Sequence, residues 1–234
     1  MDINFSTLSA NLSRVYSPRI ALRPLTLADG WPLFEATKNP LFNQYLTWPK
    51  PDQEVETLER VDLIMDAVAK GQMSAVSAVV RSTGEWIGLF RFQPYRHNGE
   101  LVKGAIEAGI WSRDTFWDGR TSLEVGVLSM DAGFKFTNAD MIYGLTAPEN
   151  RSSCAIMERG GLHRAGLTTR ITEDDREIAA QEFCVTREQW NAKGHAVRLF
   201  NYRDRQYPPA PMRAPQAAPA PVMQETAELE ESFA

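Results

Sequence analysis

A polar segment with the signature of a helix start is the chain's best candidate for binding chemistry. It opens at Asn150 and places hydroxyl groups at Ser152 and Ser153. The Asn150 amide oxygen can cap the first turn, and Gly160-Gly161 can end the helix because glycine tolerates positive φ. A polar helix N-terminus can bind anions or polar ligand groups. On this segment alone, an ordinary capped helix without a ligand is the favoured explanation of the same residues.

Hydrophobic patterns predict the elements that would position this segment. Strands are expected at 19–25, 74–81, 86–93, 105–112, 141–147 and 182–185, and helices at 26–38, 53–70, 122–136, 150–159 and 186–192. A meander of strands is followed by strand–helix–strand crossovers. This order predicts an α/β (mixed α+β) fold class, with one mixed, mostly antiparallel sheet and helices on both faces.

Composition excludes several classes of protein. The 234 residues are 43% hydrophobic and 24% charged, as in soluble globular proteins. No apolar run approaches the ~20 residues that span a bilayer, and the start lacks a basic-then-apolar signal, so we expect a cytoplasmic protein without membrane contact. Cys154 and Cys184 are the only cysteines, and the histidines lack ligand spacing. Neither a disulfide framework nor a metal site is therefore expected.

Net charge and low-complexity composition distinguish the C-terminal tail from the body of the chain. The net charge is −5, of which residues 207–234 contribute −3 (one Arg, four Glu), leaving about −2 for the body. A near-neutral body offers no bulk attraction for nucleic acid. The Pro/Ala-rich run at 207–221 favours extended, unpacked conformations. We expect an N-terminal extension (1–17), one domain (18–200) and a disordered tail (201–234) that either carries a protein-binding motif or only aids solubility.

The ordered set of elements and local strings resembles the GNAT N-acetyltransferases, in the branch of the ribosomal-protein N-terminal acetyltransferases. The resemblance covers residues 19 to about 190. The strings are Arg19-Ile20-Ala21-Leu22-Arg23-Pro24-Leu25, Tyr45-Leu46-Thr47-Trp48-Pro49, Trp86-Ile87-Gly88, Ile106-Glu107-Ala108-Gly109-Ile110-Trp111, Phe116-Trp117, Asn150-Arg151-Ser152-Ser153 and Glu158-Arg159-Gly160-Gly161-Leu162.

The resemblance implies a single GNAT-like domain whose sheet is splayed in the middle, with acetyl-CoA as co-substrate in the splay. The splay would lie between the strands at 106–112 and 141–147. A backbone amide there could polarise the thioester carbonyl. The loop at 118–122 would wrap the pyrophosphate at a helix N-terminus. The implied cofactor-binding residues are Ile110, Trp111, Ser112, Gly119, Arg120, Thr121, Ser122 and Asn150.

The resemblance also implies a direct transfer of acetyl to a primary amine, on a protein N-terminus or a small molecule, by a monomer or homodimer. Ser153 would protonate the CoA thiolate, and Glu107 would act through a water as general base. Phe42, Tyr45 and Trp48 would line the acceptor pocket. The alternatives are that Ser153 satisfies backbone groups, that Glu107 faces solvent or pairs with an arginine, and that the three aromatic residues pack in the core.

One loop departs from the family pattern, Trp-Gly-x-Gly-x-Ala-x-Glu. At 117–124 this chain has Arg120 in place of the central glycine and Ser122 in place of the small residue. Asp118 adds a negative charge beside the expected pyrophosphate, whereas Arg120 could bind it. A second hypothesis is therefore a GNAT-fold module that has lost catalysis and serves as an interaction or structural subunit.

Overall fold

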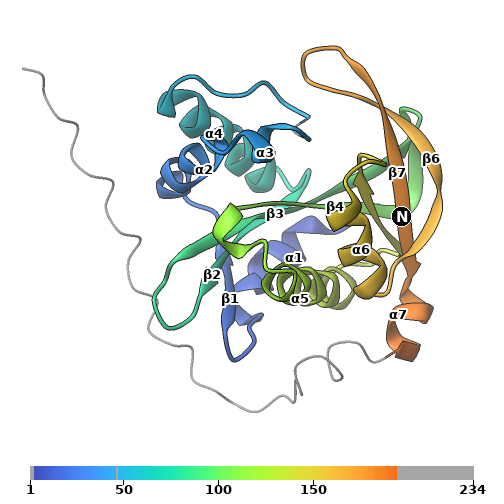
Figure 1. Cartoon of the computed structure of the whole chain (residues 1–234). Helices are drawn as coiled ribbons and strands as arrows, with labels where there is room; N and C mark the ends of the chain where they lie inside the picture. The colour runs from blue at the N-terminus through green and yellow to red at the C-terminus, as the bar shows by residue number, and fades with distance from the viewer. Residues whose placement is uncertain (1–2, 46, 194–234) are drawn as a thin grey trace, which may run out of the picture.

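The computed structural model describes residues 3–45 and 47–193, which form a seven-stranded sheet in the order β1-β2-β3-β4-β5-β7-β6 (Figure 1). The strands are β1 (Ile20–Pro24), β2 (Ser74–Val80), β3 (Trp86–His97), β4 (Glu100–Ser112), β5 (Met141–Thr146), β6 (His163–Ile171) and β7 (Glu177–Thr186). The helices are α1 (Phe5–Asn11), α2 (Gly30–Thr37), α3 (Pro40–Asn43), α4 (Glu54–Ala69), α5 (Arg120–Phe136), α6 (Arg151–Arg159) and α7 (Arg187–Lys193). Short 3-10 turns, η1 (Leu12–Arg14), η2 (Leu27–Asp29) and η3 (Asp114–Phe116), complete the described elements.

The sheet is splayed between β4 and β5, which pair in parallel within an otherwise antiparallel set of described strands. Their pairing begins at Ala105 with Met141 and ends at Ala108 with Gly144. Beyond that point β4 continues along β3 as far as Ser112, and β5 continues along β7. The predicted mixed, mostly antiparallel sheet with a central splay is confirmed.

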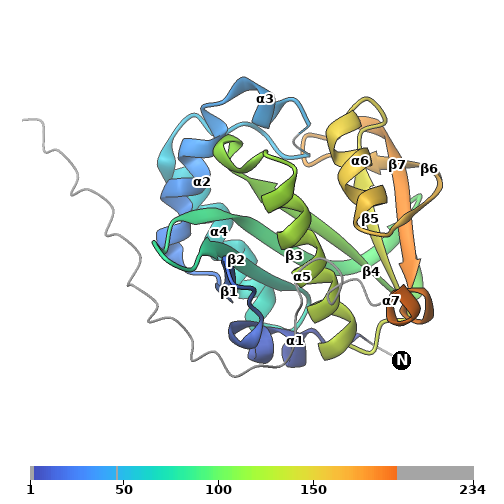
Figure 2. The ribbon, with the colours of Figure 1, turned by 60° about the horizontal axis from the view of Figure 1, so that its bottom comes forward.

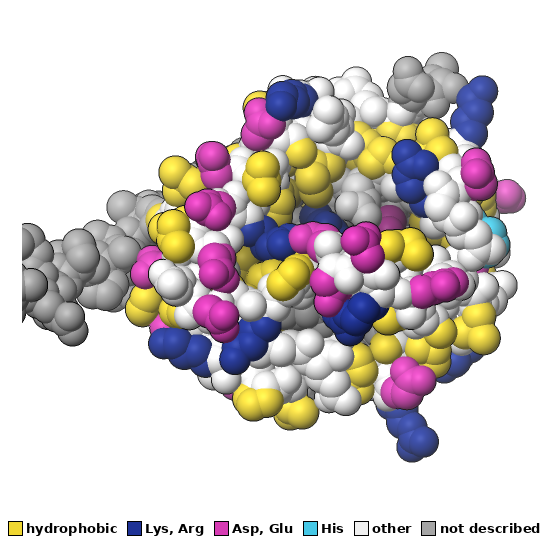
Figure 3. Space-filling model, turned by 90° about the horizontal axis from the view of Figure 1, so that it is seen from above, with side chains coloured by type: hydrophobic (Ala, Val, Ile, Leu, Met, Phe, Trp, Pro, Cys, Tyr) yellow, Lys and Arg dark blue, Asp and Glu magenta, His cyan; other side chains and the backbone are white. Residues whose placement is uncertain are grey.

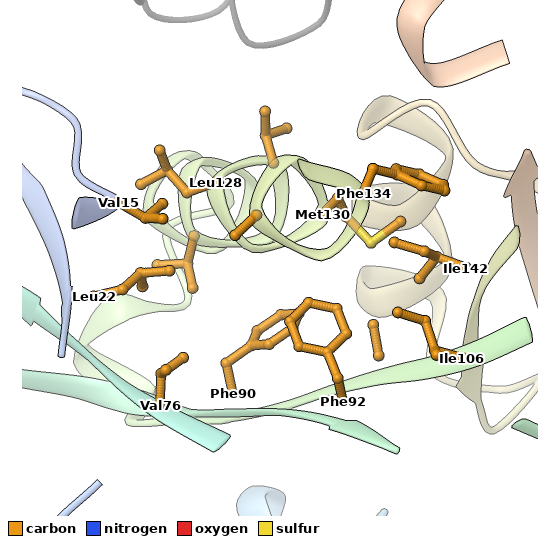
Figure 4. Packing of buried hydrophobic residues seen from close by; sticks show 14 of the residues in the cluster. Val15, Leu22, Val76, Phe90, Phe92, Ile106, Leu128, Met130, Phe134 and Ile142 are labelled. Atoms are coloured by element: carbon orange, nitrogen blue, oxygen red, sulfur yellow. The ribbon is translucent and has the colours of Figure 1, made fainter. Parts of the chain in front are cut away.

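Helix α5 covers one face of the sheet. Its Leu128 and Phe134 are buried against Phe90, Phe92 and Ile106, which alternate with residues of the opposite face (Figure 4). Burying each such side chain contributes roughly 1.5–3 kcal/mol, so this layer is the main core. Helix α6 lies beside α5 in front of the same face (Figure 2).

Helices α2 and α4 lie on the other side of the sheet, opposite α1 and α5 (Figure 1). Leu33 of α2 and Val61 and Ile64 of α4 form a second buried cluster with Ala75 and Leu89 of the strands. Helices on both faces were expected. No helix in the described part of the chain is long and apolar enough to cross a membrane.

Several elements differ from the sequence-based expectation. Strand β6 was not predicted from the sequence. The reason is that this edge strand is largely exposed and shows no apolar alternation. Strands β3 and β4 extend further than predicted and form a long hairpin. Within the expected extension at 1–17, Phe5 and Leu8 of α1 lie in the main core. The expected tail at 201–234 lies outside the described residues.

Candidate active site

The N-terminus of α6 is capped as its sequence predicts. The Asn150 Oδ1 atom accepts a hydrogen bond from the Ser153 N–H at 3.1 Å, and Ser153 is half-buried in the first turn. At the other end the Gly161 N–H donates to the Glu158 carbonyl at 3.0 Å, with Gly161 at φ 94°. The Asn150 oxygen is therefore engaged by the helix, and the Ser153 hydroxyl is held near the end of β5.

The loop before α5 is capped by its own acid. Gly119 has φ 69°, and the Asp118 carboxylate accepts hydrogen bonds from the Thr121 N–H at 2.6 Å and the Thr121 hydroxyl at 2.9 Å. Desolvation acts to raise the pKa of Asp118, but these bonds and one from the Arg120 N–H outweigh it and lower the pKa. Asp118 is thus an anion that occupies N–H groups of this helix start.

Two guanidinium groups flank the same loop. Arg120 is exposed in the first turn of α5. Arg159, in the last turn of α6, places Nη1 3.8 Å from the position that a Cβ atom on Gly119 would take. Both cations can bind phosphate oxygens. Sequence reasoning assigned no function to Arg159, because its proximity to the loop arises only from the packing of α6 beside α5.

An ion pair between a half-exposed arginine and a buried carboxylate holds the start of α5 in place. Glu124 is 1% exposed and accepts hydrogen bonds from the Ser17 hydroxyl and from two nitrogens of Arg19, of which Nε lies at 2.8 Å. Arg19 immediately precedes β1, so the pair ties this end of β1 to the second turn of α5. Arg19 and Glu124 stood in two separate sequence strings, and only the fold brings them together.

The splay exposes backbone groups of β4 where they were predicted. Residues Ile110, Trp111 and Ser112 follow the last β4–β5 pair and hydrogen-bond only toward β3 within the described sheet. The Trp117 indole N–H donates to the Ser112 carbonyl at 3.1 Å, so this carbonyl already has a side-chain partner. The N-termini of α5 and α6 lie at this end of the sheet, because each helix follows the carboxyl end of one of two parallel strands (Figure 2).

Glu107 lies on the sheet face opposite α5 and is 7% exposed. It pairs with Arg170 Nη1 at 3.1 Å and accepts a hydrogen bond from Gln93 Nε2 at 3.1 Å. Pairing with an arginine was one of the alternatives left open by the sequence. The partner itself escaped prediction because Arg170 belongs to the unpredicted strand β6.

The three aromatic residues predicted for the acceptor pocket separate in the structure. Phe42 and Trp48 are buried in the second core cluster, whereas Tyr45 is 36% exposed. Trp48 also contacts the ring of Trp111 edge-on at a centroid distance of 5.5 Å. Trp48 therefore packs in the core and at the same time forms a wall next to the end of β4.

A groove lies on this face between the α2–α4 side and the β6–β7 hairpin, and its two sides are bonded to each other. Arg60 of α4 forms a bidentate pair with Glu173 of the hairpin turn at 2.8 and 2.6 Å. The Glu173 N–H donates to the Thr47 carbonyl at 2.9 Å. Figure 3 shows the surface hollowed between these two sides, with charged side chains of both signs beside the hollow.

A second carboxylate on this face is buried and hydrogen-bonded. Glu182 is 4% exposed and accepts hydrogen bonds from the Tyr95 hydroxyl and from His97 Nδ1, the latter at 2.9 Å. The Tyr95 ring stacks on Tyr143 at 3.8 Å. Desolvation and the Glu182 carboxylate raise the pKa of Tyr95, which keeps its hydroxyl protonated as a donor. The His97 side chain is 47% exposed and is bonded to this cluster.

No group of three or more His, Cys, Asp or Glu side chains that could hold a metal ion occurs among the described residues. The polar groups instead gather in two places. Backbone N–H groups and cations surround the splay on the α5–α6 side. Carboxylates, guanidinium groups and indole rings line the groove on the other side.

Comparison with known proteins identifies the class. The family model of the acetyltransferase (GNAT) domain matches residues 19–163. The chain belongs to the GNAT family and is an acetyltransferase by that membership, as the sequence resemblance implied.

Individual relatives are distant. An uncharacterised N-acetyltransferase, p20, of Bacillus licheniformis is 23% identical over 156 residues, covering 67% of this chain and 85% of the relative. A protein assigned as a ribosomal-protein-serine acetyltransferase of Vibrio cholerae has a similar structure, with TM-score 0.63, 17% identity and coverage of 74% and 96%. RimJ of Mycobacterium smegmatis, solved in complex with CoA-disulfide, gives TM-score 0.60, 17% identity and coverage of 75% and 90%. At this identity the two structures show a shared fold.

Proposed function

We propose that this protein transfers acetyl from acetyl-CoA directly to a primary amine, on a protein N-terminus or a small molecule. The splay of β4 from β5, with the N-termini of α5 and α6 at the same end, is the observation that carries the proposal. The related fold of RimJ was solved with a CoA derivative, which supports CoA as the carrier.

The residues around the splay fit such a co-substrate in most respects. Backbone groups at 110 and 111 that do not pair with β5 suit the amide groups of a pantetheine arm, with Asn150 alongside. The Ser112 carbonyl already accepts from the Trp117 indole N–H. N–H groups at 119–122, with Arg120 and Arg159 beside them, suit a pyrophosphate. The Asp118 carboxylate opposes this last interaction, because it is an anion and engages Thr121.

The chemistry requires two proton movements. The amine nitrogen bonds to the thioester carbonyl carbon, the carbon–sulfur bond breaks, and the sulfur leaves as a thiolate. Ser153, half-buried in the first turn of α6, donates the proton that neutralises the thiolate. Glu107, an anion paired with Arg170, takes up the proton that the amine loses, through a water. No covalent intermediate on the protein is needed.

Two measurements test the proposal. Isothermal titration with acetyl-CoA should show binding tighter than about millimolar, and weaker binding would exclude the catalytic function. Ser153→Ala should lower kcat by about 10²-fold or more while changing acetyl-CoA affinity little. Ser152→Ala is the matched control, because Ser152 is exposed in the same helical turn. Equal losses of turnover in both variants would remove Ser153 from the mechanism.

The second hypothesis is a GNAT-fold interaction subunit without catalysis, and it predicts the opposite outcome of the acetyl-CoA titration. Its supporting observation is the acid cap of Asp118 at the expected pyrophosphate loop. It requires that the protein fail to bind acetyl-CoA and that deletion of residues 207–234 abolish capture of a specific protein partner.

A further inference from the structure

The side chain of Arg91 lies across β4 at the mouth of the splay. Arg91 of β3 pairs with Gly109, the first residue of β4 beyond the last β4–β5 pair. Its Nε atom is 3.5 Å from the position that a Cβ atom on Gly109 would occupy. Because Gly109 has no side chain, Arg91 can lie flat over the strand. Its guanidinium then stacks over the Trp111 ring, 5.0 Å from the centroid.

Arg91 differs from the two other arginines of the groove. Arg60 has Glu173 as its bidentate partner, and Arg170 has Glu107 at 3.1 Å. The Arg91 guanidinium contacts an aromatic face and makes no hydrogen bond to another residue in the described ranges. Its hydrogen-bond donors are therefore available to a ligand in the groove.

The surrounding charges do not neutralise Arg91. The ionised groups that act on it are two carboxylates, of Glu107 and Glu173, and two guanidiniums, of Arg60 and Arg170. These four charges balance one another in number, so the set of five groups that includes Arg91 carries a net charge of +1. Glu182, the further carboxylate on this face, is already bonded to Tyr95 and His97. A partly buried cation in this position favours an anionic ligand.

We propose that the amine acceptor also carries a carboxylate, which the Arg91 guanidinium binds in the groove next to the splay. This inference rests on the proposed acetyltransferase function. A guanidinium is planar and donates two parallel hydrogen bonds to a carboxylate, and stacking on Trp111 holds its plane in one orientation. The carboxylate belongs to a free amino acid or to an acidic side chain near the N-terminus of a peptide.

Matched acceptor pairs test the proposal and separate the two sources of the carboxylate. The first pair is a free amino acid and its α-amide, and the second is a pair of tetrapeptides with Asp or Asn as the second residue. For at least one pair, the wild-type kcat/KM for the acid should exceed that for its neutral partner by about 10-fold or more. Most of this difference should come from a lower KM for the acid. Arg91→Gln should remove this preference, and Arg91→Lys should retain part of it.

Arg96→Gln is the control for Arg91→Gln, because Arg96 lies on the same strand, is exposed and bonds only to the nearby Gly99 carbonyl among described residues. It should keep the wild-type preference. Equal use of acid and amide by the wild type in both pairs would overturn the proposal. So would a preference for the acid that survives in Arg91→Gln.

A binding readout keeps this test separate from that of the acetyltransferase function. The acids and amides are titrated into the CoA-saturated protein by calorimetry. Acid-selective binding that Arg91→Gln abolishes supports the carboxylate site even without turnover, whereas unselective binding contradicts it. Failure to bind CoA at all would count against the proposed function. The acids and amides would then be titrated into the protein without CoA, and the carboxylate site would again be judged by acid-selective binding that Arg91→Gln abolishes.

Discussion

Asp118→Asn should tighten the binding of CoA. Asp118 places a full negative charge at the start of α5, and its lowered pKa keeps that charge throughout the neutral pH range. Asparagine caps helices about as well as aspartate, so its amide oxygen can keep the capping bond from the Thr121 N–H while the charge disappears. The Thr121 hydroxyl, which donates to the second carboxylate oxygen, would accept from the asparagine NH2 group instead. The substitution therefore isolates the electrostatic effect of Asp118 on a pyrophosphate in the loop.

The magnitude follows from Coulomb's law. Asp118 is exposed, so a dielectric constant of about 40–80 applies. At a separation of about 5 Å, removal of the repulsion from one phosphate charge then contributes roughly 1–1.5 kcal/mol, or about 5- to 10-fold in Kd. Salt should reduce the gain, because exposed charges are screened. The gain should be flat between pH 6 and 8, since a carboxyl with a lowered pKa does not titrate there.

The assay is isothermal titration of CoA at low and at near-physiological salt. Asp66→Asn is the control, because Asp66 is an exposed carboxylate on α4, on the opposite side of the sheet. It should leave Kd unchanged. Equal or weaker CoA binding by Asp118→Asn at low salt, with an unchanged fold by circular dichroism, would refute the reasoning and show that this carboxylate does not oppose the pyrophosphate.

Two further predictions concern stability. Arg187→Gln should lower the free energy of unfolding by about 2–4 kcal/mol in urea titrations, because Arg187 donates to the carbonyls of Phe134, Thr137 and Ala139 at the end of α5. An unchanged urea midpoint would contradict this assignment. Glu124→Gln should cost about 2 kcal/mol and weaken CoA binding, because Glu124 and Arg19 position the start of α5. Thermal unfolding and CoA titration measure the two effects, and an unchanged melting temperature would show that the pair does not stabilise the fold.

The elements that build the splay could be predicted from local sequence. Apolar alternation identified β4 and β5, and the cap at Asn150 identified α6 within one residue. These signals are short in range: a buried strand alternates, and a helix start needs an acceptor for its free N–H groups. The departure at Asp118 was equally visible as a residue type.

The edge of the sheet and the groove could not be predicted in the same way. Strand β6 carries Arg170 but exposes most of its side chains, so it has no apolar pattern to reveal it. The pairs Arg170–Glu107 and Arg60–Glu173 join residues more than sixty positions apart. Sequence spacing holds no information on such contacts.

The sequence by itself determined the family, the order of the central elements and the positions that border the splay, because these depend on local patterning and on strings of adjacent residues. Only the tertiary structure decided which charges are neutralised. Asp118 became a cap rather than a free acid, and Glu107 acquired an arginine partner. Arg91 was left over Gly109 and the Trp111 ring, with no hydrogen bond to another described residue. The physical reason is that electrostatic balance depends on distances between separate elements, which are set when the sheet and its helices pack together.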